Sequence, residues 1–378
     1  MEKQNPQYYE RSDDLMKNTF GASISLTLFG ESHGEAIGAV LDGLCPGIAI
    51  DHEFIKKRLS LRRPSGKIST SRVEADEYKI VSGVFNGYTT GTPLTIIIPN
   101  TNTQSKAYTP EIPRPGHADY TAECKYHGFQ DYRGGGHFSG RLTAPIVAAG
   151  AILSLALMQK GIYIGTHIAS LHSERDRGFC DDVMSDITTL SEMTFPVLDS
   201  DAADRMRKIA EDAAAEGDSV GGVLETAVVG CPAGVGEPWF DTVEGILSHA
   251  LFSIPAIKGV EFGDGFGFAS LKGSEANDPI RYVDGCVVTE TNRNGGINGG
   301  ITNGMPITFR CAVKPTPSIY KPQNSVNMNT AENTVLEIKG RHDPAIIHRA
   351  RIVVDSITAL VIADMLAVRY GTDWLTRK

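Results

Sequence analysis

Alternating and continuous apolar stretches mark the expected strands of this chain. Residues 23–29 (SISLTLF) alternate between apolar and polar side chains, which predicts a strand with one buried face. Residues 94–98 (LTIII) are apolar apart from Thr95 and predict a buried strand. Signals of the same kind predict further strands at 37–41, 222–230, 257–263, 306–313 and 334–339.

Helix-start residues precede the main helical patterns. Capping side chains or helical spacing predict helices over 52–60, 120–127, 144–160, 201–216, a segment beginning at 243, and 344–369. The residues expected to cap the starts are Asp51, Asp119, Thr143, the capping-box-like pair Asp241 and Glu244, and Asp343, which Pro344 follows. Gly128, Gly161 and Gly217 stand where three of these helices should end.

The order of these elements indicates the fold class. Strands occur in pairs with long helices between them, which is typical of an α+β protein. Residues 100–116 are polar and rich in Pro, and they predict a long loop. No Pro- or Ser-rich linker marks a domain boundary. We therefore expect one large domain over 18–378, preceded by a loosely ordered extension over 1–17.

Composition narrows the possible functions. The 378 residues have a formal net charge of -9, which argues against a nucleic-acid binder and requires an anion binder to gather its cations locally. The six Cys lie at least 25 residues apart, so they form no zinc pattern and suggest a reducing compartment. The ten His show no helical metal-binding spacing, so we expect no metal. The polar N-terminus and an apolar run of only 144–158 predict a cytoplasmic protein without a membrane span.

Two glycine-rich segments are candidate ligand sites. Residues 133–141 (RGGGHFSGR) resemble an anion cradle, with free backbone N–H groups and flanking Arg; a flexible surface loop is the alternative. Residues 295–304 (GGINGGITNG) suit contact with a planar ligand or another backbone, or a series of tight turns. Residues 314–318 (KPTPS) then place a cation and hydroxyls in a stiff turn that suits phosphate.

Three short motifs carry candidate acids and bases. GESHG at 30–34 is a Gly-rich turn, a serine-hydrolase elbow built on Ser32, or a rigid mount for His33 as acid or base. His117 and Asp119 could form a proton-transfer pair, although Asp119 also suits a helix cap. Asp343 is likewise either an acid for proton transfer or a helix cap.

A basic run stands out in this acidic chain. Its members could form a solvated face or, with arginines elsewhere, a cluster for a multiply charged anion. They are Arg62, Arg63, Lys67 and Arg72, with Arg114, Arg133, Arg141 and Arg341 as the distant partners. From the residues alone, a serine hydrolase that pairs Ser32 with a C-terminal His such as His342, and an anion- or RNA-binding module, also remain open.

Taken together, the motifs resemble those of the chorismate synthase family. The matching segments are FGESHG at 29–34, DGLCPG at 42–47, LRRP at 61–64, SGVFNGYTTGTP at 82–93, RPGHADYT at 114–121, DYRGGG at 131–136, EGDSVGG at 216–222, AIKGVEFGDGF at 256–266, NGGINGGITNG at 294–304, KPTPS at 314–318 and GRHDP at 340–344. Each motif is weak alone, but the ordered set is highly specific and spans about 18–369.

The resemblance implies a lyase. The implied reaction is the 1,4-trans elimination of phosphate from 5-enolpyruvylshikimate 3-phosphate, which yields chorismate in the last common step of aromatic amino-acid biosynthesis. It implies reduced FMN as cofactor without net redox change, and NADPH as a possible reductant. It further implies a homotetramer in which each chain sandwiches its helices between antiparallel sheets.

The resemblance also implies roles for individual residues. His33 and His117 match two essential proton donors, and Asp343 matches an aspartate that acts with the flavin in proton removal. The implied substrate or NADP contacts are Arg62, Lys67, Arg114 and Arg133. The implied flavin contacts are His137, Phe138, Ser139, Pro255, Ala256, Gly299, Lys314, Pro315, Thr316, Pro317, Ser318 and Arg341. The chain departs from the family pattern at His137-Phe138, where Arg-Ser or Arg-Ala is common, and at Pro255.

Overall fold

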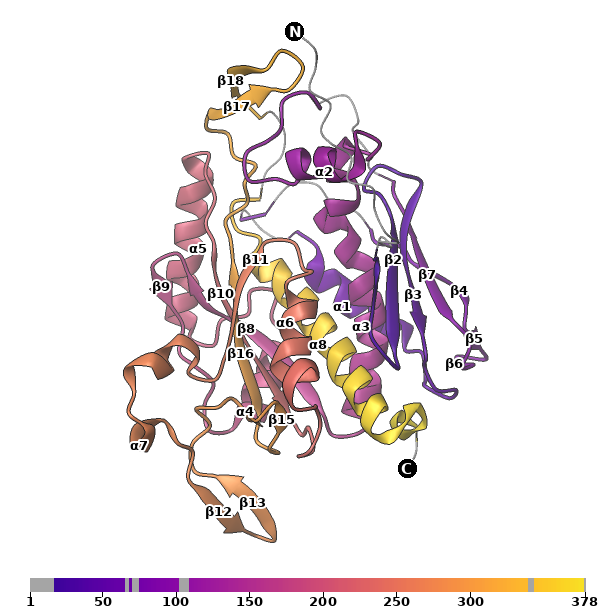
Figure 1. Cartoon of the computed structure of the whole chain (residues 1–378), viewed down its shortest axis with the longest axis vertical. Coiled ribbons are helices and arrows are strands. Elements are labelled where there is room, and N and C mark those ends of the chain that lie inside the picture. The colour runs from indigo at the N-terminus through magenta and orange to yellow at the C-terminus, as the bar shows by residue number, and fades with distance from the viewer. Residues whose placement is uncertain (1–16, 65–67, 70–74, 102–108, 339–342, 377–378) are drawn as a thin grey trace.

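Two antiparallel sheets enclose the long helices of the molecule. The computed structural model describes residues 17–64, 68–69, 75–101, 109–338 and 343–376. Helices α1 (His52–Arg62), α3 (Thr143–Met158), α6 (Val243–Leu251) and α8 (Ile347–Tyr370) lie between the sheets (Figure 1). The expected α+β sandwich of helices between antiparallel sheets is confirmed.

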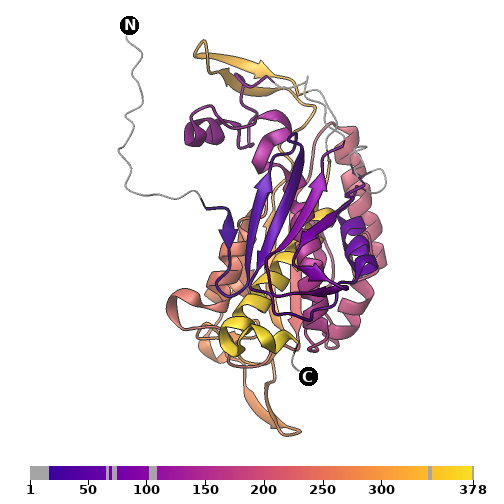
Figure 2. The ribbon, with the colours of Figure 1, turned by 90° about the vertical axis from the view of Figure 1, so that its right-hand side faces the viewer.

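The first sheet has the strand order β1-β2-β3-β7-β4, and every neighbouring pair is antiparallel. Its strands are β1 (Thr19–Phe20), β2 (Ser25–Gly30), β3 (Ala36–Asp42), β7 (Leu94–Pro99) and β4 (Lys79–Ser82). Figure 2 shows this sheet facing the viewer with α8 behind it. Strands β3 and β7 pack against α3, and the predicted burial of 94–98 holds for one face only, because Ile97 on the opposite face is partly buried, as is Val40 of β3.

The second sheet has the order β11-β16-β10-β8-β9 and is also antiparallel throughout. Its strands are β11 (Ile257–Phe262), β16 (Ile307–Val313), β10 (Gly222–Val229), β8 (Tyr163–Leu171) and β9 (Glu174–Arg175). Helices α4 (Val183–Leu190) and α5 (Ser200–Ala215) lie outside it (Figure 1).

Short elements complete the part of the chain that the structure describes. They are β5 (Val84–Phe85), β6 (Tyr88–Thr89), α2 (Asp119–Tyr126), α7 (Gly273–Ala276), β12 (Ile280–Val283), β13 (Cys286–Thr289), β14 (Ile297–Asn298), β15 (Ile301–Thr302), β17 (Gln323–Asn327), β18 (Glu332–Leu336) and the 3-10 turns at 133–138, 140–142, 239–241, 265–270 and 372–375. Strand β18 begins and ends earlier than the predicted 334–339.

Helix α3 is the apolar centre of the fold. The helical stretch over 133–158 is the one helix in the described ranges that is long and apolar enough to cross a membrane, yet 89% of its apolar window is buried inside the protein. It packs along α8, where Gly150 lies directly against Ser356. The helix is therefore a core helix, which needs apolar residues on every side because other elements cover it all round.

Several predicted helix caps are wrong, because their side chains have stronger partners elsewhere. Helix α8 begins at Ile347 rather than 344, and Asp343 binds Arg349 instead of capping the helix. Asp119 lies inside the first turn of α2 and binds Arg114. An ion pair satisfies both oxygens of a carboxylate, whereas a cap uses one.

Two other helix starts also differ from the prediction. Helix α6 is capped by the Thr242 hydroxyl, which accepts from the Gly245 N–H at 2.9 Å, so the expected Asp241–Glu244 box does not form. Before α3, a 3-10 turn places Thr143 inside the helix, where its hydroxyl donates to the Gly140 carbonyl at 2.6 Å. In contrast, Asp51 caps α1 as predicted.

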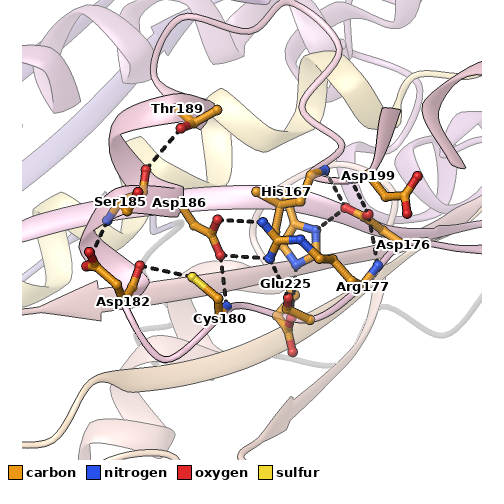
Figure 3. A network of polar contacts seen from close by, with 12 residues as sticks. His167, Asp176, Arg177, Cys180, Asp182, Ser185, Asp186, Thr189, Asp199 and Glu225 are labelled. Atoms are coloured by element: carbon orange, nitrogen blue, oxygen red, sulfur yellow. Dashed lines mark hydrogen bonds and ion pairs between the residues drawn. The ribbon is translucent and has the colours of Figure 1, made fainter. Parts of the chain in front are cut away.

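An ionic network anchors the outer side of the second sheet (Figure 3). His167 of β8 is fully buried between Asp176, 2.8 Å from Nδ1, and Glu225 of β10, 2.9 Å from Nε2. Burial disfavours the imidazolium, but hydrogen bonds to the two carboxylates outweigh burial and raise the pKa of His167. Next to this cluster, Arg177 forms a two-point contact with Asp186 of α4.

Candidate active site

One large cavity gathers residues from both halves of the chain. Its volume is about 1670 Å³, and it opens between β2, α2, the glycine-rich segment 133–141, the start of β11 and the N-terminal half of α8. Leu26, Ile146 and Val353 belong to its apolar lining. A pocket for one drug-sized ligand measures roughly 300–1,000 Å³, so this cavity has room for two ligands side by side.

Most residues singled out in the sequence line this cavity. They are His33, Arg62, Arg114, His117, His137, Phe138, Ser139, Pro255, Ala256, Lys314, Thr316, Pro317 and Asp343. Pro315 and Ser318 belong to the same turn without lining the wall. Arg133 pairs with Asp131 and is not part of the lining, and Gly299 lies away from it in the β14–β15 turn. Lys67 and Arg341 fall outside the described residues.

His33 is mounted against the triple glycine. It lies in the turn between β2 and β3, where the Ser32 N–H donates to the Gly136 carbonyl at 3.1 Å. Gly134, Gly135 and Gly136 all have positive φ, and a Cβ on Gly134 would lie 2.7 Å from Nε2 of His33. The predicted close backbone approach is therefore confirmed, and the flexible-loop alternative is wrong, since this geometry requires glycine.

The turn also excludes a nucleophile elbow. Strand β3 follows Ser32 directly, whereas an elbow requires a helix at that point. The Ser32 hydroxyl is fully buried, and no hydrogen-bond partner for it exists among the described residues. A buried hydroxyl without a partner costs free energy unless a ligand or water satisfies it.

His117 is held at the opposite wall by the turn at 314–318. Its Nε2 lies 2.6 Å from the Ser318 hydroxyl, and the Lys314 ammonium donates to the Gly116 carbonyl at 2.6 Å. Asp119, the expected proton partner of His117, instead forms two 2.7 Å contacts with Arg114. Burial alone would raise the pKa of Asp119. Arg114 outweighs burial and holds that pKa below its usual value, with a smaller contribution from His117.

Cations converge near the turn. Burial, together with repulsion from Lys258 on β11, lowers the pKa of Lys314. Lys258 lines the cavity as well. The Lys314 N–H donates to the carbonyl of Ala256, whose φ of 78 is strained for a residue with a Cβ. Two neighbouring ammonium groups favour an anion between them, as the KPTPS turn predicted.

A carboxylate that the sequence did not single out organises the arginines. Asp76 is buried and bridges Arg62, at 2.8 Å, and Arg141, which lie at the end of α1 and just before α3. Burial would raise its pKa, but the two guanidinium groups outweigh burial and lower it. Asp76 lies only fourteen residues from Arg62, yet nothing in its local sequence distinguishes it from the acids beside it.

Arg349 is a second residue of the site that the sequence did not single out. It lies in the first turn of α8, and its Nη1 is 2.7 Å from an oxygen of Asp343, while its Nε donates to the Arg62 carbonyl at 2.8 Å. A cation at the start of a helix dominated by buried apolar residues was an available signal, because such a charge needs a buried partner.

His137 and Phe138 occupy the departure from the family pattern. The Nδ1–H of His137 donates to the Gly30 carbonyl at 2.8 Å, which leaves Nε2 available to the cavity. Phe138 is partly exposed and meets Tyr126 of α2 edge to face. Both side chains therefore remain at the cavity wall.

Fold and site together place two histidines and several arginines and lysines around one large cavity, an arrangement typical of an enzyme that acts on an anionic substrate. Residues 24–367 match the family model of chorismate synthase. The chain is 46% identical to the chorismate synthase of Thermococcus gammatolerans, over 94% of this chain and 99% of the relative. It is 45% identical to that of Korarchaeum cryptofilum, over 91% and 96%. A crystal structure titled as that of a chorismate synthase superposes with a TM-score of 0.74 at 27% identity, covering 93% of this chain and 94% of the other.

The chain belongs to the chorismate synthase family. It converts 5-enolpyruvylshikimate 3-phosphate to chorismate and phosphate in the shikimate pathway. The family uses reduced FMN. The cavity fits a phosphorylated cofactor beside a substrate with two carboxylates and one phosphate, because it has the volume for both and a cationic wall that includes Arg62, Arg114 and Lys314.

Proposed function

We propose that His33 and His117 supply protons and that Asp343 removes one during the 1,4-elimination. The observation that supports this assignment is their convergence. His33 and His117 come from the first third of the chain and Asp343 from the last third, and all three line one cavity together with Arg62, Arg114 and Lys314. Imidazole suits proton donation because its pKa lies near neutrality.

In this proposal the cations hold the substrate. Arg62 and Arg114 bind its carboxylates or phosphate, and Lys258 flanks the departing group. The carbon–oxygen bond to phosphate breaks, one carbon-bound proton is lost towards Asp343, and His117 places a proton on the leaving phosphate. Lys67 and Arg133 join the substrate- or NADP-binding set on the strength of the resemblance.

The flavin contacts are proposed on the same basis. Reduced FMN would supply electron density to the substrate transiently when bound, with no net redox change. His137, Phe138, Ser139, Pro255, Ala256 and the turn at 314–318 would hold it, with Arg341. His33 lies on the same side as 137–139, because the triple glycine joins them. Gly299 enters this set through the resemblance alone.

The decisive experiment is anaerobic turnover of the two histidine variants. With reduced FMN and 5-enolpyruvylshikimate 3-phosphate, His33→Ala and His117→Ala should each form chorismate roughly 10²–10⁴ times more slowly, because each loses a general acid. Equal release of chorismate and phosphate by the wild type checks the reaction itself. His172→Ala is the matched control, since this ring is exposed on the turn after β8. Wild-type rates in both cavity variants would refute the assigned roles.

We further propose that the enzyme is a cytoplasmic homotetramer that can take electrons from NADPH. Six well-separated Cys, none of them in a disulfide among the described residues, support a reducing compartment. Arg62 at the cavity wall supports an anionic reductant. Aerobic turnover with oxidised FMN and NADPH alone tests the reductase activity. Turnover only after an external reductase is added would exclude it.

A further inference from the structure

Arg349 joins two parts of the cavity wall that are far apart in sequence. Its Nη1 lies 2.7 Å from Oδ2 of Asp343, in the segment before α8. Its Nε donates at 2.8 Å to the carbonyl of Arg62, the last residue of α1. Only 19% of the Arg349 side chain and 14% of the Asp343 side chain are exposed, so solvent screens this pair weakly.

The guanidinium group is suited to this double contact. It is planar, and its N–H groups form a rigid fork, so one acceptor fixes the direction of the donors to the other. The Arg62 carbonyl orients the fork, and the fork in turn orients the Asp343 carboxylate. The Arg62 side chain is fixed separately, by Asp76, which also holds Arg141. One connected set of contacts thus positions Asp343 relative to Arg62.

We propose that Arg349 is a positioning residue, which holds the carboxylate of Asp343 in the orientation needed to remove the substrate proton. The inference rests on the proposed function of Asp343. Arg349 acts through Asp343, so its loss lowers the rate of the proton-removal step and leaves substrate affinity largely unchanged. A purely structural role would change stability alone, and a substrate-binding role would raise KM.

A double-mutant cycle tests the proposal. The variants are Asp343→Asn, Arg349→Gln and the double variant, each assayed anaerobically with reduced FMN. We expect Arg349→Gln to lower kcat about 10- to 100-fold, with KM for 5-enolpyruvylshikimate 3-phosphate within about threefold of the wild type. The double variant should be no slower than Asp343→Asn, because Arg349 then has no carboxylate left to orient.

Two further variants keep the result interpretable. Arg349→Lys retains the charge but offers a single ammonium, so it should recover part of kcat and identify the fork as the missing feature. Arg205→Gln removes an arginine from a largely exposed Arg–Glu contact between α5 and β9 and should behave as the wild type. Melting temperatures of the apo proteins and dissociation constants for oxidised FMN provide readouts independent of turnover. The sum of the melting-temperature shifts of the two single variants should exceed the shift of the double variant.

Each contrary result is distinct. Losses in kcat that multiply in the double variant, or a rise confined to KM, would show that Arg349 acts on the substrate directly. A lowered melting temperature with wild-type kcat would show that Arg349 has only a structural role. Full activity in Asp343→Asn would instead refute the proposed role of Asp343 itself, whatever the Arg349 variants do.

Discussion

At the residue scale, Gly134 shows how tightly the site is built. Its φ is +61, and the nearest atoms to an added Cβ are Nε2 of His33 at 2.7 Å and Oγ of Ser32 at 2.9 Å. Real Cβ atoms do not tolerate such separations, so any side chain here must displace the histidine. The three consecutive glycines are therefore a requirement of the site, whose backbone closes against His33.

We predict that Gly134→Ala raises the activation free energy of turnover by at least as much as it lowers the free energy of unfolding. The positive φ costs an L-residue about 1–2 kcal/mol, and the displaced His33 loses its alignment. The measurement pairs anaerobic kcat with the midpoint of chemical unfolding. Gly161→Ala is the matched control, because Gly161 has φ +75 and open space around it. Comparable kcat in both variants would show that the approach to His33 is unimportant.

His167 makes stability depend on pH. Its pKa is raised above the ordinary value of about 6.5, so the folded protein retains the proton to higher pH than the unfolded chain does. The charged ring therefore stabilises the fold fully below about pH 6.5, and this contribution is lost as pH rises through the folded pKa. The lowered pKa of Asp176 acts in the opposite sense, since its contribution is lost on acidification.

From this sign we predict that the melting-temperature difference between wild type and His167→Asn narrows from about pH 6.5 upward. The comparison is made by calorimetry across that range. His172→Asn, on the exposed turn that follows β8, should show a small difference that does not change with pH. A gap that widens with pH would mean that the buried ring is neutral.

At the scale of elements, the contact between α3 and α8 is the centre of the packing. Both helices are buried over most of their length, and Gly150 lets their backbones approach at Ser356. A Cβ on Gly150 would lie only 2.6 Å from the Cα of Ser356, which no side-chain rotation can relieve. The two helices also carry the site, because Thr143 and Ile146 of α3 and Arg349 and Val353 of α8 line the cavity.

We therefore predict that Gly150→Ala destabilises the protein by about 1–3 kcal/mol, although alanine favours helices intrinsically. Urea unfolding at neutral pH measures the loss. Gly273→Ala provides the control, since a Cβ there meets nothing within 4 Å and φ is not positive. A more stable Gly150→Ala variant would show that the helices can separate without cost.

At the scale of the whole molecule, the exposed apolar surface is distributed unevenly. Strands β12 and β13 form a two-stranded hairpin that projects from the body in both views (Figures 1 and 2). Ile280 is 74% exposed, Tyr282 76% and Val287 63%. A two-stranded hairpin is marginally stable alone in water, and exposed apolar groups of this size favour association.

We predict that native mass spectrometry at micromolar concentration gives four times the 40.7 kDa chain mass. Burial of exposed apolar surface between copies is the physical reason. Dilution over a hundredfold range separates a stable assembly from a transient one. A monomer at every concentration would contradict the proposed homotetramer.

The amino-acid sequence by itself determined the local elements and the identity of the family. The apolar periods located the strands and long helices, and eleven ordered motifs marked a chorismate synthase, because glycine turns and charged loops are local features. Asp51 illustrates this level, since a cap depends on the three residues that follow it.

Only the tertiary structure decided how the charged side chains are paired. Asp343 and Asp119 form ion pairs where caps were predicted, Asp76 bridges two arginines without any local signal, and the local sequence of Arg349 indicates that it needs a partner but not which one. The physical reason is that a charge is stabilised by whichever opposite charge the fold brings close, and Asp343 and Arg62 meet through Arg349 although they lie far apart in the chain. Spacing along the chain therefore identifies the charged residues, and packing of α1, α3 and α8 assigns their partners.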